Sequence, residues 1–134
     1  MKADILVDTS IWIEYFNNAG SKSGDRLENL LLQGNVCGAG IILAELLQGA
    51  KVEKEYNAIL YNYTALPIVD ETIDTWVMVG KISYNLRREG VTIPVTELLI
   101  ASLAIEFGLT LFTHDQHFLK IPDIKLLDDT ENRE

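Results

Sequence analysis

Short apolar runs alternate with longer amphipathic segments along this chain, and the alternation predicts strands separated by helices. The run 4–7 ends in Ile-Leu-Val and is too short for a globular helix, so we expect a buried strand there. Segment 65–69 contains Pro67, which cannot donate a backbone hydrogen bond and therefore indicates an edge strand. Further strands are predicted at 35–38, 110–113 and 124–127.

Helices are predicted between these strands from the spacing of apolar side chains and from capping residues. An aromatic helix is expected directly after Asp8-Thr9-Ser10, and Asp70 is expected to cap the longest helix. Trp12, Trp76 and Phe112 are predicted to lie in the core. The other predicted helices cover 23–33, 41–47, 51–63, 71–89 and 95–107.

Strands that alternate with helices are typical of βαβ units. We therefore predict one α/β domain over residues 1–134, with a parallel sheet flanked by helices on both faces. The polar residues 128–134 are expected to form a tail. In open α/β sheets ligands bind beyond the carboxyl ends of the strands. The functional site is therefore expected at that edge of the sheet.

The charge balance bears on the possible ligands, because 20 acidic and 11 basic residues give a formal net charge of −9. Such a balance argues against simple phosphate binding, which usually leaves a basic footprint. An acidic chain can still act on RNA if cations lie between its carboxylates and the phosphates. Arg87 and Arg88, near the end of the longest helix, are the candidates for RNA contact, although their favourable place at a helix C-terminus explains them equally well.

Nothing in the sequence indicates a membrane or an oxidising compartment. No apolar run reaches the roughly 18 residues that a membrane-spanning helix needs. The N-terminal residues lack the pattern of a signal peptide. The one cysteine, Cys37, cannot form an internal disulfide and is interpreted as a small buried hydrophobic residue. A cytoplasmic location is expected.

Four acidic residues stand out because they occur within apolar segments. Asp8 and Asp115 each follow a predicted strand, at the edge where a binding crevice is expected. Glu45 is the one charged residue in the apolar helix 41–47. Glu97 lies in the first turn of the helix 95–107, where the helix dipole favours an anion.

Carboxylates brought together in apolar surroundings repel one another, and each buried one costs several kcal/mol unless it is paired or bound to a cation. Oxygen ligands of this kind select hard ions such as Mg2+ or Mn2+. Each acid also has a simpler structural interpretation. Asp8 suits a helix cap, Glu45 a side chain that reaches solvent, Glu97 a dipole partner and Asp115 a turn residue.

Four segments in this order resemble PIN domains, and the similarity covers essentially the whole chain. They are Val7-Asp8-Thr9-Ser10, Ala44-Glu45-Leu46, Gly90 through Glu97-Leu98-Leu99-Ile100-Ala101, and Thr113-His114-Asp115-Gln116-His117-Phe118. The resemblance is closest to the VapC-type toxins of bacterial toxin–antitoxin modules.

This resemblance implies a parallel-sheet α/β fold and Mg2+- or Mn2+-dependent endoribonuclease activity. By matching position, it implies that the catalytic, metal-binding residues are Asp8, Glu45, Glu97 and Asp115. Thr9, Ser10 and Thr113 would then be the polar groups that support these ligands. It also implies a homodimer and a cognate antitoxin with a segment that lies across the active site.

Two other interpretations remain open from the sequence. Glu97 stands where PIN domains usually have aspartate, which leaves room for a PIN-fold module that binds a partner without catalysis. A receiver-like signalling domain would use Asp70 as the phosphoacceptor near Asp8. His114, His117 and Cys37 are too few soft ligands for a structural zinc site, so both histidines are predicted to be solvent-facing loop residues.

Overall fold

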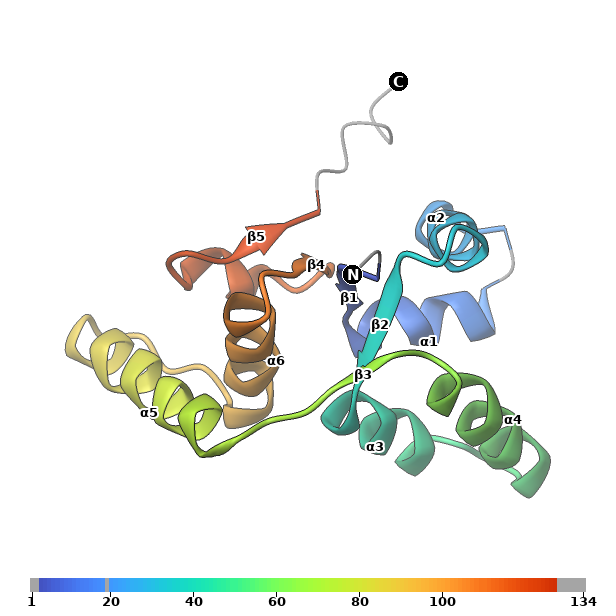
Figure 1. The fold of residues 1–134 in the computed structure, drawn as a ribbon, viewed down its shortest axis with the longest axis horizontal. Helices are drawn as coiled ribbons and strands as arrows, with labels where there is room; N and C mark the ends of the chain where they lie inside the picture. Colours follow the sequence, from blue (N-terminus) through green and yellow to red (C-terminus); the bar gives the residue numbers. More distant parts are fainter. Residues whose placement is uncertain (1–2, 19, 128–134) are drawn as a thin grey trace.

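A five-stranded parallel sheet forms the centre of the computed structural model, which describes residues 3–18 and 20–127 (Figure 1). The predicted tail 128–134 lies outside the described residues. The sheet order is β3-β2-β1-β4-β5, and every neighbouring pair is parallel. The strands are β1 (Ile5–Val7), β2 (Val36–Ala39), β3 (Ile68–Val69), β4 (Thr110–Phe112) and β5 (Lys125–Leu126).

Helices cover both faces of this sheet, as the alternation of segments predicted. In Figure 1, α5 and α6 lie on one side of the strands and α1, α2 and α4 lie on the other. In the described ranges no helix is both long enough and apolar enough to cross a membrane. The helices are α1 (Thr9–Asn17), α2 (Lys22–Leu32), α3 (Gly40–Gln48), α4 (Glu53–Thr64), α5 (Ile73–Arg88), α6 (Val95–Glu106) and the 3-10 helix η1 (Gln116–Lys120).

The core is centred on β1, β4 and α6. Leu6, Val7 and Leu111 are fully buried in the two central strands. Every residue from Leu98 to Ala104 is buried, so most of α6 is enclosed by the rest of the fold, whereas Val95 in its first turn is 58% exposed. β3 is an edge strand, as Pro67 predicted, and the carbonyl of Pro67 accepts a 2.7 Å hydrogen bond from the Gly38 N–H.

Two expectations about α5 are wrong. Thr72, not Asp70, caps this helix, because the hydroxyl of Thr75 accepts from the Thr72 N–H at 2.9 Å and closes a capping box. Trp76 was expected in the core but is 43% exposed. The helix is turned so that the face carrying Thr75 and Val79 packs inward.

The chain reverses its direction across the sheet at β1. From β1 it proceeds to β2 and β3 on one side, and then returns to β4 and β5 on the other. The carboxyl ends of β1 and β4 therefore form a topological switch point, where open α/β sheets hold their ligands. Asp8 directly follows β1, and Thr113 directly follows β4.

Candidate active site

Asp8 is a buried carboxylate at this switch point, only 7% exposed. Its Oδ1 accepts the Thr9 N–H at 2.8 Å, which makes it the N-cap of α1. Its Oδ2 accepts from the hydroxyl of Thr113 at 2.7 Å and from that of Ser10 at 3.3 Å. These donors fix the orientation of the carboxylate.

Glu45 joins the same cluster through Thr9. It lies half-buried on α3, and its Oε1 accepts a 2.5 Å hydrogen bond from the Thr9 hydroxyl. Thr9 thus donates its backbone N–H to Asp8 and its hydroxyl to Glu45. This one residue sets the relative position of two carboxylates that are 37 positions apart in the chain.

Asp115 is connected to Asp8 through Thr113. The Asp115 N–H donates to the Thr113 hydroxyl oxygen at 2.9 Å, and that hydroxyl donates to Asp8. Asp115 also caps η1, because its Oδ1 accepts from the His117 N–H at 2.9 Å. The loop after β4 is therefore folded back onto the end of β1.

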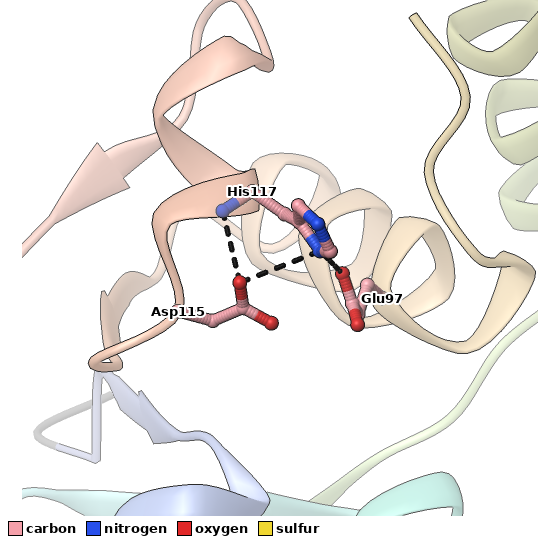
Figure 2. A group of neighbouring side chains, drawn as sticks. All are labelled: Glu97, Asp115 and His117. Atoms are coloured by element: carbon pink, nitrogen blue, oxygen red, sulfur yellow. Dashed lines mark hydrogen bonds and ion pairs between the residues drawn. The ribbon is translucent and has the colours of Figure 1, made fainter.

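Glu97 reaches the cluster from the first turn of α6, and His117 contacts it there (Figure 2). His117 Nδ1 lies 2.5 Å from Glu97 Oε1 and 3.4 Å from Asp115 Oδ1. The hydrogen bond to Glu97 is the main cause that raises the pKa of His117, and the charges of Glu97 and Asp115 raise it further.

Burial is the main cause that raises the pKa of Glu97. The hydrogen bond from His117 lowers this pKa, whereas the charges of Asp115 and Asp8 raise it. The carboxylates that follow β1 and β4 thus act on the carboxylate in the first turn of α6. A concentration of negative charge in a partly buried place favours a bound cation.

The structure brings all four sequence-predicted acids into one network of contacts. It also places the three predicted supporting residues, Thr9, Ser10 and Thr113, on carboxylate oxygens. The simpler interpretations hold at the same time for Asp8 and Asp115, which both cap helices, and for Glu97, which lies in a first turn.

His117 is the contact that sequence reasoning missed. It was weighed as part of a zinc set with His114 and Cys37 and was predicted to be a solvent-facing loop residue. It is exposed but lies in η1, and the three possible zinc ligands do not gather. His114 Nε2 lies 3.2 Å from Glu14 Oε1, and Cys37 is buried in β2 with its sulfur toward the Ile5 carbonyl. The signal that could have found it is its position two residues after Asp115. Because Asp115 caps η1 through the His117 N–H, this spacing brings the two residues together.

Arg87 and Arg88 are exposed in the last turn of α5, with the Arg88 guanidinium over the Tyr84 ring. In Figure 1 this end of α5 points away from the sheet. The receiver-like interpretation does not fit the sheet order. Asp70 follows the edge strand β3, and β2 lies between β3 and the strand that leads to Asp8.

Comparison with known proteins agrees with this geometry. Residues 5–124 match the family model described as PIN domain. The chain is 33% identical over 119 residues to ribonuclease VapC11 of Mycobacterium tuberculosis, covering 85% of this chain and 88% of the relative. It is 29% identical over 126 residues to ribonuclease VapC2 of Rickettsia felis, covering 90% and 94%.

A solved structure with the same fold is that of VapBC2 from Rickettsia felis bound to a DNA fragment from their promoter. The TM-score is 0.78 at 27% identity, over 92% of this chain and 96% of that one. The fold and the acidic switch point thus define a PIN domain. Within that class, the chain belongs to the family of VapC ribonucleases.

Proposed function

We propose that this protein is a divalent-cation-dependent endoribonuclease, the toxin of a toxin–antitoxin pair, which hydrolyses RNA phosphodiesters at Asp8, Glu45, Glu97 and Asp115. The observation that carries the proposal is the gathering of these acids beside the switch point of the sheet. The hydroxyls of Thr9 and Thr113 connect Asp8 with Glu45 and Asp115, and His117 contacts Glu97. Its relatives VapC11 and VapC2 are named ribonucleases.

The donor set fits a hard divalent cation. The carboxylates offer oxygen ligands, and the charges of Asp115 and Asp8 raise the pKa of Glu97 by a repulsion that a cation would relieve. We propose Mg2+ or Mn2+ as the ion. Once bound, such an ion stabilises charge on a phosphate and lowers the pKa of a coordinated water.

The protein's own residues would orient that ion and the RNA. Thr9 and Thr113 hold two of the carboxylates by short hydrogen bonds, so little reorganisation is needed when substrate arrives. We propose Arg87 and Arg88 as phosphate contacts. Replacing each by alanine is expected to weaken RNA binding for all sequences and to reduce the salt-dependence slope by about 1 per residue.

We propose that a segment of a cognate antitoxin blocks this site. A pocket opens beside Glu45, and its apolar wall includes Ile13, Phe16 and Ile59 from α1 and α4. Ile13 and Phe16 are large hydrophobic residues exposed to solvent. A partner segment with apolar side chains for this pocket and a basic side chain for the carboxylates would exclude RNA. A cytoplasmic location is proposed as well, because the thiol of Cys37 is free and buried.

We also propose a homodimer formed through α5. Ile73, Val77 and Tyr84 are 75%, 63% and 60% exposed, and they line one face of this helix. Gly80 lies among them with nothing within 4 Å of an added Cβ, which allows another backbone to approach closely.

A second copy suits this face of α5 because the face is self-complementary in charge. Asp74 and Lys81 are exposed on the same flank of the helix. Antiparallel pairing of two α5 helices about a two-fold axis would bring Asp74 of each copy toward Lys81 of the other. It would also oppose the two helix dipoles and place Val77 against Gly80.

The decisive experiment compares RNA cleavage by the wild type and Asp8→Asn with Mn2+, Mg2+ and EDTA. A mixture of purified transfer and ribosomal RNA serves as the substrate. Asparagine is as good an N-cap as aspartate, so α1 should stay folded while cleavage falls below detection. Asp70→Asn is the matched control, since Asp70 is exposed beyond the edge strand, and it should cleave normally. Cleavage that persists in Asp8→Asn or in EDTA contradicts the proposal.

A further inference from the structure

The ring of His117 occupies a place between two of the proposed metal ligands (Figure 2). Its Nδ1, one oxygen of Glu97 and one oxygen of Asp115 all lie within 4.8 Å of one another. The Glu97 contact is 2.5 Å and the Asp115 contact is 3.4 Å. Neighbouring ligands of an octahedral ion with bonds of about 2.1 Å are about 3 Å apart, so each of these two contacts would change by only about half an ångström around such an ion.

The backbone holds the ring in this position. Asp115 caps η1 through the His117 N–H, and the next residue, Phe118, is fully buried in the core. The side chain of His117 is nevertheless 47% exposed, and those of Glu97 and Asp115 are 23% and 30% exposed. An ion from solvent can therefore reach all three groups without a rearrangement of the fold.

We propose that His117 is a ligand, through Nδ1, of a cation that Glu97 and Asp115 also bind. This inference rests on the proposed function and makes the metal centre a mixed nitrogen and oxygen site. Imidazole nitrogen is a good ligand for first-row transition metals, whereas Mg2+ prefers oxygen and retains its water. A nitrogen ligand should therefore raise the affinity of this site for Mn2+ relative to Mg2+.

A different role for His117 would be to hold Glu97 by a hydrogen bond alone. The variant His117→Gln distinguishes metal binding from hydrogen bonding. The glutamine amide can still donate to Glu97, but it offers no imidazole nitrogen to a metal ion. His114→Gln is the matched control. The chain has 2 histidines, and His114 contacts Glu14 instead of the cluster.

The test measures Mn2+ bound to the full chain by electron spin echo envelope modulation, which detects nitrogen coordinated to the ion. Nitrogen coupling is expected in the wild type and in His114→Gln, and it should be lost in His117→Gln. In parallel, His117→Gln should bind Mn2+ at least about tenfold more weakly, while its affinity for Mg2+ changes less than about twofold.

Each other outcome overturns the inference in a recognisable way. Mn2+ bound without nitrogen coupling, or coupling that survives in His117→Gln, removes His117 from the ligands. An equal loss of Mn2+ and Mg2+ affinity in His117→Gln assigns it a positioning role instead. In all these cases the wild type still binds metal and cleaves RNA, so the proposed function stands. A wild type that binds neither ion would contradict the proposed function itself.

Discussion

The hydroxyl of Thr113 donates to Asp8 Oδ2 at 2.7 Å, and this bond joins the carboxyl ends of the two central strands. The two residues are 105 positions apart in the chain. The same hydroxyl accepts from the Asp115 N–H at 2.9 Å. Two of the proposed metal ligands therefore share one small side chain for their orientation.

Thr113→Val should weaken Mn2+ binding and RNA cleavage by about 10- to 100-fold, as is common when a group that orients a metal ligand is lost. The valine methyl group cannot donate to Asp8 or accept from the Asp115 N–H. Thr113→Ser retains the hydroxyl and should behave like the wild type. Cleavage rates and Mn2+ titrations measure both effects. Equal activity of the valine and serine variants would show that the hydroxyl is not required.

Gly38→Ala should lower the free energy of unfolding by about 1–3 kcal/mol. An added Cβ would lie 2.6 Å from a ring carbon of the buried Tyr63, whose hydroxyl oxygen accepts from the Ala39 N–H at 2.9 Å. The ring would have to move and leave that N–H unsatisfied. Because Ala39 leads directly into α3, the position of Glu45 should change as well.

Gly40→Ala is the matched control for this change. An added Cβ there meets nothing within 4 Å, and the residue begins α3. This variant should be neutral or more stable by up to about 1 kcal/mol. Urea unfolding of the three proteins gives the comparison. A Gly38→Ala protein as stable as Gly40→Ala would show that the Tyr63 ring adapts freely.

Val77→Asp should convert the proposed homodimer to a monomer, because it places a charge in the middle of the exposed face of α5. Val52→Asp is the matched control. Val52 is also 63% exposed, but it lies at the N-cap of α4, where aspartate is favourable. Sedimentation equilibrium distinguishes the masses. A monomeric wild type, or a Val77→Asp protein that remains dimeric, would reject this interface.

Acid should remove a stabilising contribution from Glu14. The hydrogen bond from Ser23 is the main cause that lowers the pKa of this carboxyl, and the hydrogen bond from His114 adds to it. A carboxyl with a lowered folded-state pKa stabilises the fold above its unfolded value of 4.5. This contribution disappears as the pH falls through the lowered pKa.

Glu14→Gln should therefore be less stable than the wild type at neutral pH, and the difference should shrink as the pH falls below 4.5. Urea midpoints across this range provide the measurement. Glu71→Gln, in the exposed segment before α5, should follow the wild type throughout. If Glu14→Gln and the wild type differ by the same amount at every pH, ionisation of Glu14 does not contribute to folding.

Periodicity and composition predicted the class of fold because buried strands and helix faces are local patterns. The edge position of β3 followed from one residue, Pro67, which cannot join a central ladder. The orientation of α5 did not follow. Ile73 and Val77 lie on an exposed face, whereas Thr75, Val79 and Leu86 are buried. The hydroxyl of Thr75 is satisfied there because it donates to Glu106 of α6, a contact between two helices that spacing along one helix does not reveal.

The sequence by itself determined the alternation of strands and helices and marked Asp8, Glu45, Glu97 and Asp115 as acids in apolar surroundings. It did so because a charge among hydrophobic residues is costly wherever the chain folds. Only the tertiary structure decided that the hydroxyls of Thr9 and Thr113 link these acids and that His117 contacts Glu97. Such contacts depend on the order and register of strands far apart in sequence, and no local pattern carries that information.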